Sequence, residues 1–304
     1  MGALVNHVTI SRREKFVRRS VEFILACSGF LSVLVTLGVL YILISKTWIF
    51  FKQVPLSAFF LDTVWTPLFS SQRFGIWSLV LGSMLVTTVA MLTAGPFGIL
   101  AAIYMSEFAH SRIRKILKPL LEILAGIPTV VYGYFALTMV TPALQLIIPG
   151  LNGFNALSPG LVLGLMLIPT VSSLCEDALF TTPRDLKEAA YSLGARKLST
   201  IFLVTLPYSR STIIAALFLA FGRAMGETMI VAIAAGMKAH FTFDVREPIQ
   251  TMTAYIVQVS MGDTPQNSIE YLTIFTVGTM LFVITFIFHA GSRLILRSKF
   301  KAKS

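Results

Sequence analysis

The sequence predicts an all-α, polytopic membrane protein with six transmembrane helices. Hydrophobic residues make up 55% of the 304 residues and charged residues only 13%, and the mean hydropathy is +0.79. A soluble domain of this length cannot bury so much apolar surface in one core, whereas a bilayer solvates it. Long apolar runs supply the individual helices, because a bilayer core about 30 Å thick needs about 20 residues of helix.

Six segments meet this requirement in turn. The run at 123–175 holds no charged residue and is too long for one helix, so the turn-rich segment IPGLNGFNALSPG at 148–160 divides it in two. The fifth segment is apolar apart from two charged residues. The predicted spans are 23–45, 74–106, two helices within 123–175, 211–237 and 271–292.

The basic residues indicate which side of the membrane each connection faces. Nineteen of the 25 Lys and Arg residues fall before the first span, in the second-to-third and fourth-to-fifth connections, and after the last span. The other connections hold only Lys46, Lys52, Arg73, Lys238 and Arg246. Positive residues beside spans are retained in the cytoplasm. Both termini are therefore predicted to be cytoplasmic, with tails at about 1–20 and 293–304.

Composition and motifs argue against several other classes of protein. The net charge of +11 is spread over the span ends, where anionic lipid headgroups lie, and does not indicate nucleic-acid binding. Cys27 and Cys175 lie in or beside spans and indicate neither a disulfide framework nor a metal site. No P-loop, nucleophile elbow, HExxH helix or Cys/His cluster occurs. The chain is expected not to be an enzyme, not to hydrolyse nucleotide by itself, and to bind no cofactor of its own.

The fourth-to-fifth connection, 181–210, is the most informative segment outside the spans. Thr182 is predicted to cap a short amphipathic helix that has Pro183 at its first position. Gly194 is predicted to end that helix, because glycine tolerates the left-handed conformation, and a second helix then runs to Leu206 and Pro207. The helix pair is either a docking element on the cytoplasmic side or a loop at the membrane interface.

A resemblance decides between these two interpretations. The connection resembles the EAA motif of ABC importer permeases at the spacing of that family, apart from Val204 in place of an isoleucine. The matching residues are Glu188, Ala189, Ala190, Gly194, Leu206 and Pro207. The resemblance implies a coupling helix that inserts into a separate ATPase subunit, where ATP and Mg are expected to bind.

Three further segments narrow the resemblance: FLDTVWTP at 60–67, LEILAGIPTVVYG at 121–133 and FGRAMGETM at 221–229. Together they resemble the Pst phosphate-import permeases, and the PstC-type subunit more than the PstA type. The resemblance implies a MetI-like ABC importer permease fold, with 1–304 as a single transmembrane permease domain in the bacterial inner membrane. It also implies that the substrate is inorganic phosphate, with another oxyanion as the alternative.

The same resemblance implies the partners. They are a homologous PstA-type permease, a PstB-type ATPase dimer and a PstS-type phosphate-binding protein on the periplasmic or extracellular side, with membrane lipid around the spans. A secondary transporter or a channel is the alternative class. Such a protein would also use an intramembrane charge pair, but it would not need the EAA loop.

Arg223 and Glu227 are the two charged residues inside the fifth span. An arginine at the centre of a span costs about 2.5–3.5 kcal/mol on insertion scales, so such residues face a partner or a wet pathway. Four residues apart on one helix, the two side chains are predicted to pair. Either they only neutralise each other, or the planar guanidinium contacts the passing anion. In the second case Glu227 can accept a hydrogen bond from a protonated phosphate, which sulfate cannot offer at neutral pH.

Two more features of the spans are candidates for packing and for the pathway. Gly222 and Gly226 form a small-xxx-small pair, predicted to let another helix approach closely. Thr129 follows a break at Gly126, Ile127 and Pro128, and its hydroxyl is a candidate for the substrate pathway, with a plain proline kink as the alternative. The segment 248–262 is predicted to be an interfacial or re-entrant helix, with an ordinary loop as the alternative.

Overall fold

The structure is a computed structural model that describes residues 12–266 and 268–301, with side chains from 18 to 295 apart from 267. Within these residues the chain is helical apart from loops and two isolated bridges, Trp65 to Phe74 and Gly236 to Ile249. The all-α prediction is confirmed. Residues 1–11 and 302–304 of the predicted tails lie outside the described residues, and helix already begins at Arg12 and continues to Lys301.

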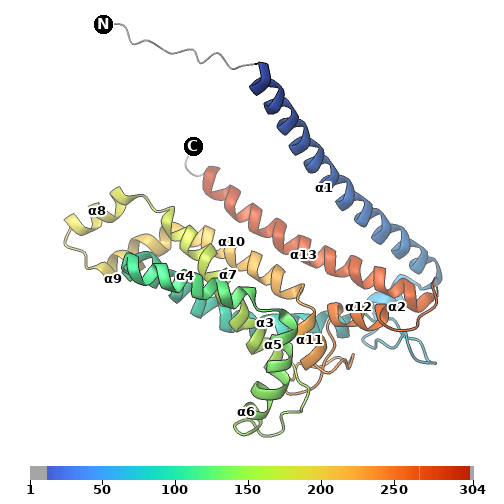
Figure 1. The fold of residues 1–304 in the computed structure, drawn as a ribbon. Coiled ribbons are helices and arrows are strands. Elements are labelled where there is room, and N and C mark those ends of the chain that lie inside the picture. Colours follow the sequence, from blue (N-terminus) through green and yellow to red (C-terminus); the bar gives the residue numbers. More distant parts are fainter. Residues whose placement is uncertain (1–11, 267, 302–304) are drawn as a thin grey trace.

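The helices lie in three groups along the chain (Figure 1). The N-terminal group is α1 (Arg12–Gln53), α2 (Leu56–Phe60) and α3 (Trp77–Ile103), followed by a π-helical turn, η1 (Tyr104–Phe108). The middle group is α4 (Ser111–Gly126), α5 (Thr129–Phe135), η2 (Ala136–Val140), α6 (Thr141–Gln145) and α7 (Leu157–Phe180). The C-terminal group is α8 (Arg184–Ser192), α9 (Lys197–Thr200), η3 (Ile201–Thr205), α10 (Leu206–Met225), α11 (Met229–Ala234), α12 (Met252–Ser260) and α13 (Ile269–Lys301).

Five stretches of helix within the described residues are long and apolar enough to cross a membrane. They are Arg18–Gln53, Trp77–Phe108, Leu157–Phe180, Lys197–Met225 and Ile269–Ile295. They match the first, second, fourth, fifth and sixth predicted spans in place, although the fifth differs at both ends. The sixth candidate is the pair Ser111–Gly126 and Thr129–Gln145, which is bent by 83°.

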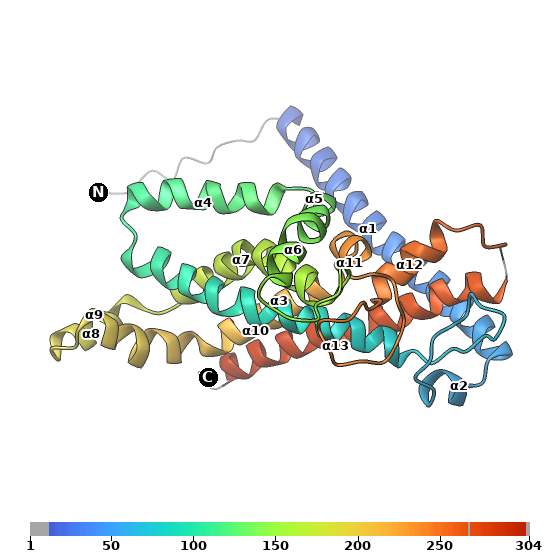
Figure 2. The ribbon, with the colours of Figure 1, turned by 90° about the horizontal axis from the view of Figure 1, so that it is seen from below.

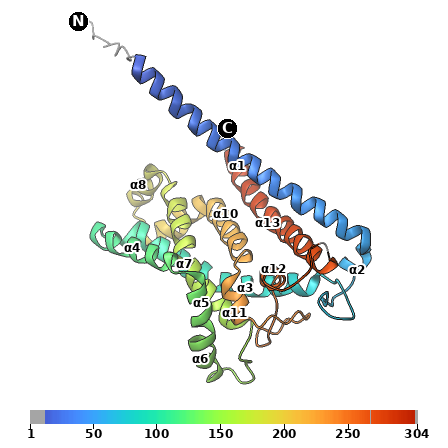
Figure 3. The same ribbon diagram turned by 45° about the vertical axis from the view of Figure 1, so that its right-hand side comes forward.

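The third predicted span is therefore not one straight helix. Ile127 is extended, with ψ 131°, and Pro128 has no N–H to continue the hydrogen bonding of α4. The chain turns there, and α5 and α6 leave α4 at a steep angle (Figure 3). The helix before the turn, α4, also carries the basic residues that were predicted to lie in the second-to-third connection. It therefore holds more charged residues than the predicted third span.

The fifth predicted span is wrong at both ends. It ends at Met225 rather than at residue 237, because the chain leaves the helix at Gly226 and begins the short helix α11 at Met229. It begins earlier than predicted, because α9, η3 and α10 form one continuous apolar stretch from Lys197. The second helix of the 181–210 connection is thus the first part of the fifth span.

Close packing of α3 against α7 forms the centre of the fold. A Cβ at Gly164 of α7 would lie 2.7 Å from the Thr93 side chain and 2.8 Å from the Ala90 carbonyl oxygen of α3. A Cβ at Gly98 of α3 would lie 2.6 Å from the Val171 side chain of α7. Only glycine permits such an approach, which holds the two helices in register.

Helices α1 and α13 form an antiparallel pair, and α13 also packs against α10 (Figures 1 and 3). The hydroxyl oxygens of Thr47 and Thr279 lie 2.8 Å apart between them. Most apolar side chains of α1 between residues 23 and 44 are exposed on this chain. Exposed apolar side chains on a long helix suit a lipid environment.

The molecule has two distinct ends, seen in Figure 2. Helices α8 and α9 lie at one end, beyond the start of α10, and α2 and α12 lie at the other. α12 confirms a helix within the predicted segment 248–262, and the Thr251 hydroxyl caps it by accepting the Ala254 amide at 3.2 Å. The EAA loop and the α12 region therefore lie on opposite sides of the molecule.

Two of the three π-helical turns precede a proline. Pro207 cannot donate an N–H, so the helix before it widens and the Leu206 amide donates to the Ile201 carbonyl five residues back. Before Pro142, the Thr141 hydroxyl donates to the Ala136 carbonyl oxygen at 2.9 Å. η3 therefore lies between the helix α8 and the part of α10 that carries Arg223.

Candidate functional site

Arg223 occupies the last turn of α10, and its side chain is exposed on this chain. Its Nη1 donates a hydrogen bond to the Thr170 hydroxyl of α7 at 3.0 Å. Thr170 follows Pro169, which lies inside α7. The guanidinium therefore lies against the middle of α7 and retains donors for a further partner.

The predicted pairing of Arg223 with Glu227 is wrong. No ion pair between described residues joins them, because α10 ends at Met225 and the two side chains no longer share a helical face. The Glu227 carboxylate accepts the Met229 amide at 3.2 Å. The carbonyl oxygen of Glu227 accepts the Thr253 hydroxyl of α12 at 2.6 Å. Glu227 thus holds the bend between α10 and α11, while its role toward a substrate stays a prediction.

The two glycines predicted for packing lie in different surroundings. A Cβ at Gly222 would lie 2.7 Å from the His289 ring of α13, so α13 packs closely at this point. The nearest atoms to a Cβ at Gly226 are carbonyl oxygens of its own helix, those of Arg223 and Gly222, at 3.6 and 3.9 Å. Among the described residues no other helix lies within 4 Å of a Cβ at Gly226, so this chain itself supplies no close packing there and the prediction for this residue stays a prediction. Gly226 lies where α10 ends.

The break before Thr129 lies close to the break after Gly226. Thr129 is the first residue of α5, and its side chain is half-buried. A Cβ at Gly133 in the same helix would lie 3.0 Å from the Met229 carbonyl oxygen and 3.1 Å from the Ile230 Cα of α11. The two segments that follow the breaks therefore pack against each other, whereas the place of Thr129 in a substrate pathway stays a prediction.

The 181–210 loop has the predicted first helix and the predicted stop. α8 runs over Arg184–Ser192, and Gly194 follows with φ +82°, a conformation that favours glycine. The amides of Gly194 and Ala195 donate to the carbonyls of Tyr191 and Ala190, at 2.9 and 3.0 Å. These bonds satisfy the end of the helix in the manner of a glycine C-cap.

The predicted Thr182 cap does not form. The Thr182 hydroxyl instead lies 3.0 Å from the Ser209 hydroxyl of α10, and Pro183 is the residue before α8. Thr182 thus joins the end of α7 to the start of α10. Leu206 and Pro207 begin α10, where Leu206 packs against the core and Pro207 is exposed.

α8 leaves an apolar surface uncovered. None of its residues is buried; Leu186 and Tyr191 are 42% and 43% exposed, and Leu193, which directly follows the helix, is 89% exposed. Glu188 and Ala189 are exposed and Ala190 is half-buried. An exposed apolar face of this kind indicates a surface for a partner.

α8 is attached to the end of α3 through charged side chains. Lys187 of α8 forms an ion pair with Glu107 of η1, and Lys197 of α9 lies over the Phe108 ring of η1, 4.6 Å from its centroid. The helix pair of the loop is therefore tied to the π-helical turn that ends the second span. Sequence spacing gave no signal for this link, because its partners are 80 residues apart.

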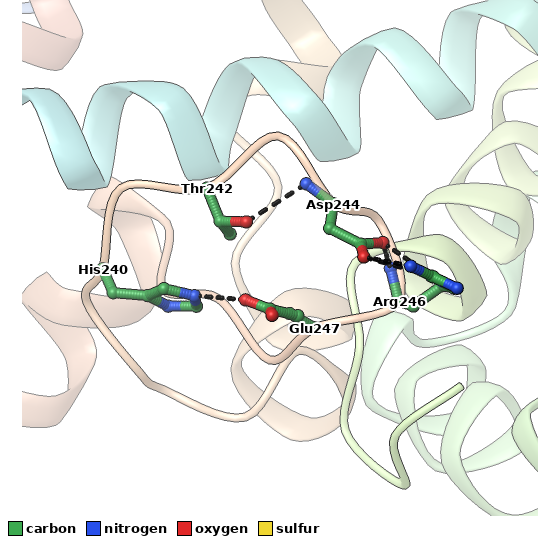
Figure 4. A network of polar contacts seen from close by, with 5 residues as sticks. All are labelled: His240, Thr242, Asp244, Arg246 and Glu247. Atoms are coloured by element: carbon green, nitrogen blue, oxygen red, sulfur yellow. Dashed lines mark hydrogen bonds and ion pairs between the residues drawn. The ribbon is translucent and has the colours of Figure 1, made fainter. Parts of the chain in front are cut away.

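At the opposite end, the loop between α11 and α12 is held by a polar network (Figure 4). Nε2 of His240 lies 2.5 Å from Oε2 of Glu247, and Nη2 of Arg246 lies 2.6 Å from Oδ2 of Asp244. Hydrogen bonds from Arg246 hold the pKa of Asp244 at about 2, and the bond with His240 lowers the pKa of Glu247. The network holds this surface loop in place. The Arg246 carbonyl oxygen in the loop also accepts a hydrogen bond from the Asn152 amide, 3.1 Å away.

Long apolar helices with a charged side chain at a helix break are typical of a membrane protein that moves a polar solute. Residues 94–300 match the family model described as "Binding-protein-dependent transport system inner membrane component". The chain belongs to this family.

Individual relatives of the chain are permeases as well. The chain is 34% identical over 224 residues to the probable ABC transporter permease protein YqgH of Bacillus subtilis (strain 168), covering 74% of this chain and 72% of the relative. It is 32% identical over 258 residues to the phosphate transport system permease protein PstC of Xylella fastidiosa (strain 9a5c), covering 79% of this chain and 78% of the relative.

Solved structures share the fold. A bacterial ABC transporter for import of the acidic polysaccharide alginate matches over 95% of this chain and 99% of that chain, with a TM-score of 0.62 and 17% identity. The inward-facing MetNI methionine ABC transporter matches over 74% of this chain and 94% of that chain, with a TM-score of 0.53 and 16% identity. These likenesses confirm the predicted MetI-like permease fold.

Proposed function

We propose that this chain is the PstC-type permease subunit of an ATP-driven phosphate importer in the bacterial inner membrane. The observation that carries the proposal is the 32% identity to a PstC permease over 79% of this chain. The geometry of Arg223 supports it, because a guanidinium with free donors beside a helix break suits an oxyanion.

The partners follow from the class of transporter. A homologous PstA-type permease completes the pathway, a PstS-type protein delivers phosphate from outside, and a PstB-type ATPase dimer binds ATP and Mg. The chain itself contributes translocation and no hydrolysis. Both termini are cytoplasmic, on the side of the α8 loop, which agrees with the basic residues of the loop and tails.

Arg223 binds the anion in this proposal. Its planar guanidinium offers parallel hydrogen bonds to two oxygens of phosphate, and the Thr170 hydroxyl at 3.0 Å fixes its direction. Glu227 holds the bend from α10 to α11 through its contacts with Met229 and Thr253. Its carboxylate also supplies an acceptor for the proton of hydrogen phosphate.

Coupling runs through α8. The exposed Leu186, Tyr191 and Leu193 enter the ATPase, and the ion pair of Lys187 with Glu107 transmits movement of α8 to η1 and α3. We expect Glu188→Lys to uncouple uptake from hydrolysis because it reverses a charge on the docking face. Gly194→Asp should do the same, because a side chain at φ +82° is strained.

This coupling prediction is measured as uptake and as ATP hydrolysis stimulated by the binding protein, at equal abundance of assembled complex. Tyr191→Phe serves as the matched control, because it keeps the ring on the same exposed face and should retain coupling. Normal uptake with Glu188→Lys and Gly194→Asp together would contradict the assignment of α8.

The substrate is tested with the reconstituted complex. Uptake of labelled phosphate should proceed, and unlabelled sulfate should not compete with it. Uptake of sulfate in preference to phosphate would mean that the substrate is another oxyanion. The class of transporter would remain the same. Uptake that continues without ATP would instead indicate a secondary transporter or a channel.

A further inference from the structure

A cavity of about 310 Å³ lies beside α12, at the end of the molecule opposite α8 (Figure 2). Three segments that are far apart in the sequence form its walls. They are the loop 65–69, the segment 237–239 that follows α11, and residues 250–258 in and before α12. The first of them ends the motif FLDTVWTP at 60–67, to which the proposed function gives no role. Neither Arg223 nor Thr170 lines this cavity.

Buried aromatic side chains form one wall of the cavity. Trp65 is 2% exposed, and its ring lies edge-on to the Tyr255 ring, 5.1 Å between centroids. The Tyr255 hydroxyl lies 2.7 Å from the Thr273 hydroxyl of α13, which fixes the ring in place. An apolar wall of this kind keeps water from one side of a bound group and so strengthens its electrostatic interactions.

The backbone before Lys238 has an unusual conformation. Gly236 has φ +97°, and Met237 has φ +49° although it is not a glycine. Such a conformation persists only where the surrounding structure holds it, and it is common at ligand sites. Here Gly236 forms a bridge with Ile249, whose amide donates to the Ala235 carbonyl oxygen at 2.9 Å. The segment that carries Lys238 is therefore held beside the start of α12.

Lys238 and Gln258 supply donors to the cavity that the described residues leave unused. The Lys238 ammonium forms no ion pair with a described residue. Oε1 of Gln258 accepts a hydrogen bond from Nε2 of Gln250, whose side chain is buried. This bond orients the Gln258 amide and leaves its Nε2 group to donate to a further partner.

The cavity carries a positive charge. Lys238 is the one charged residue among the described residues that line it, and no carboxylate lines it. The carboxylates of neighbouring segments are engaged elsewhere: Asp62 with Arg73, Glu247 with His240, and Glu270 with Gln72. One cation, one free amide donor and no opposing carboxylate favour an oxyanion as the ligand.

We propose that this cavity binds one oxyanion group of the phosphate type. The Lys238 ammonium and the Gln258 amide are its donors, and the Trp65 ring is the wall beside it. The group belongs either to free phosphate or to the headgroup of a phospholipid, and the experiment below separates these two sources. The inference rests on the proposed function only for the choice of phosphate as the probe.

The emission of Trp65 tests the site directly. The full chain is purified in dodecyl maltoside, which holds no phosphate group, with Trp48→Phe and Trp77→Phe so that Trp65 is the only indole. Inorganic phosphate should change the emission and reach saturation, because indole emission responds to a charge beside the ring. Lys238→Gln should weaken this binding about tenfold or more, since a charged hydrogen bond is lost.

A matched control removes a lysine elsewhere. Lys52 is exposed in the last turn of α1 and does not line the cavity, so Lys52→Gln should bind phosphate as tightly as the unaltered chain. Equal binding by Lys238→Gln and Lys52→Gln would overturn the site.

A nearly isosteric change tests the second donor. Gln258→Glu keeps the acceptor for Gln250 but replaces the free amide donor with a negative charge, so it should abolish the response to phosphate. A response equal to that of the unaltered chain would overturn the role of Gln258.

Equilibrium dialysis with labelled phosphate repeats the test with all three tryptophans present. This measurement is needed because Trp77 donates to the Phe60 carbonyl oxygen at 2.6 Å, a bond that Trp77→Phe removes. Binding should persist in Arg223→Gln and be lost when Lys238→Gln is added. Loss of all binding in Arg223→Gln alone would overturn a site separate from Arg223.

The source of the group is tested in nanodiscs that contain phosphatidylglycerol. If free phosphate is the ligand, the Trp65 response should be the same in these nanodiscs as in detergent. If a headgroup is the ligand, the nanodiscs themselves should shift the emission, phosphate should add no further change, and Lys238→Gln should abolish the shift. No response of Trp65 to phosphate or to phosphatidylglycerol would overturn the proposal.

Failure of the proposed function gives a different result. A complex that imports another oxyanion would change the proposed substrate, while a Trp65 response that depends on Lys238 would still support the site. Normal uptake of phosphate by the complex, together with a Trp65 response that Lys238→Gln leaves unchanged, would overturn the site and leave the proposed function in place.

Discussion

The two helix breaks of this chain are made in different ways. Between α4 and α5, Pro128 removes a backbone donor, and the Tyr132 hydroxyl donates to the Leu124 carbonyl oxygen at 2.8 Å across the turn. Between α10 and α11, two hydrogen bonds to Glu227, from Met229 and Thr253, hold the bend. The first break begins at a residue that lacks a backbone donor, whereas the second is held by hydrogen bonds to Glu227.

This difference predicts that the second break is the easier one to alter by changing a side chain. The segments after both breaks, α5 and α11, pack against each other at Gly133. Arg223 lies in the last turn of α10, just before the second break, and its guanidinium contacts Thr170 of α7.

The largest expected effect is at Arg223. Arg223→Lys should lower phosphate uptake by about tenfold or more, because an ammonium cannot form the parallel bonds and a charged hydrogen bond is worth about 1.5–3 kcal/mol. Arg223→Gln should lower it further. Uptake is measured at equal membrane abundance, with Arg210→Lys in the second turn of α10 as the matched control.

The same site allows a sharper test of the second break. Because Arg223 and Glu227 do not pair, the double change Arg223→Leu with Glu227→Leu should recover no more uptake than Arg223→Leu alone. Recovery by the double change would mean that the two charges only neutralise each other, and the break would then have no part in anion binding.

A smaller effect is expected where the two breaks meet. Gly133→Ala places a Cβ 3.0 Å from the Met229 carbonyl oxygen, and overpacking of this kind costs about 1–3 kcal/mol. Gly126→Ala is the matched control, since nothing lies within 4 Å of its Cβ. Thermal unfolding in detergent should show a loss of stability for Gly133→Ala alone. Equal unfolding temperatures for both variants would argue against the contact between α5 and α11.

The smallest effect is expected in the outer loop after α11. Hydrogen bonds from Arg246 hold the pKa of Asp244 at about 2, below its ordinary value of 3.8. The stability that this carboxylate contributes is complete above the ordinary pKa and is lost as the pH falls toward 2. Between pH 5 and pH 3 the unfolding temperature of the native protein should therefore fall slightly more than that of Asp244→Asn. An equal fall would mean that the loop network is not formed.

The spans were largely predictable, because burial in lipid depends on local composition. Uncharged runs located five of the candidate spans, and Pro128 marked the break in the remaining one. The 83° bend was not predictable, since proline removes a hydrogen bond without fixing the direction of the next helix. Gly194 was predictable as a helix end because its conformation is a local property.

The site was less predictable, because its contacts join distant parts of the chain. Helical spacing assigned Arg223 to Glu227, yet the partner is Thr170, 53 residues away. The buried ion pair of Glu176 in α7 with Arg114 in α4 was missed for the same reason, because its partners are 62 residues apart.

The π-helical turn η3 sets the directions in which the side chains of α10 point. Each residue of an α-helix advances the direction of its side chain by about 100°, and a π-helical turn holds one residue more than an α-helical path over the same rise. Residues 201–205 therefore determine toward which neighbour Arg223 points, although they lie far from it along α10. If the turn relaxed to a regular α-helix, the guanidinium would rotate away from Thr170 without any change at the site itself.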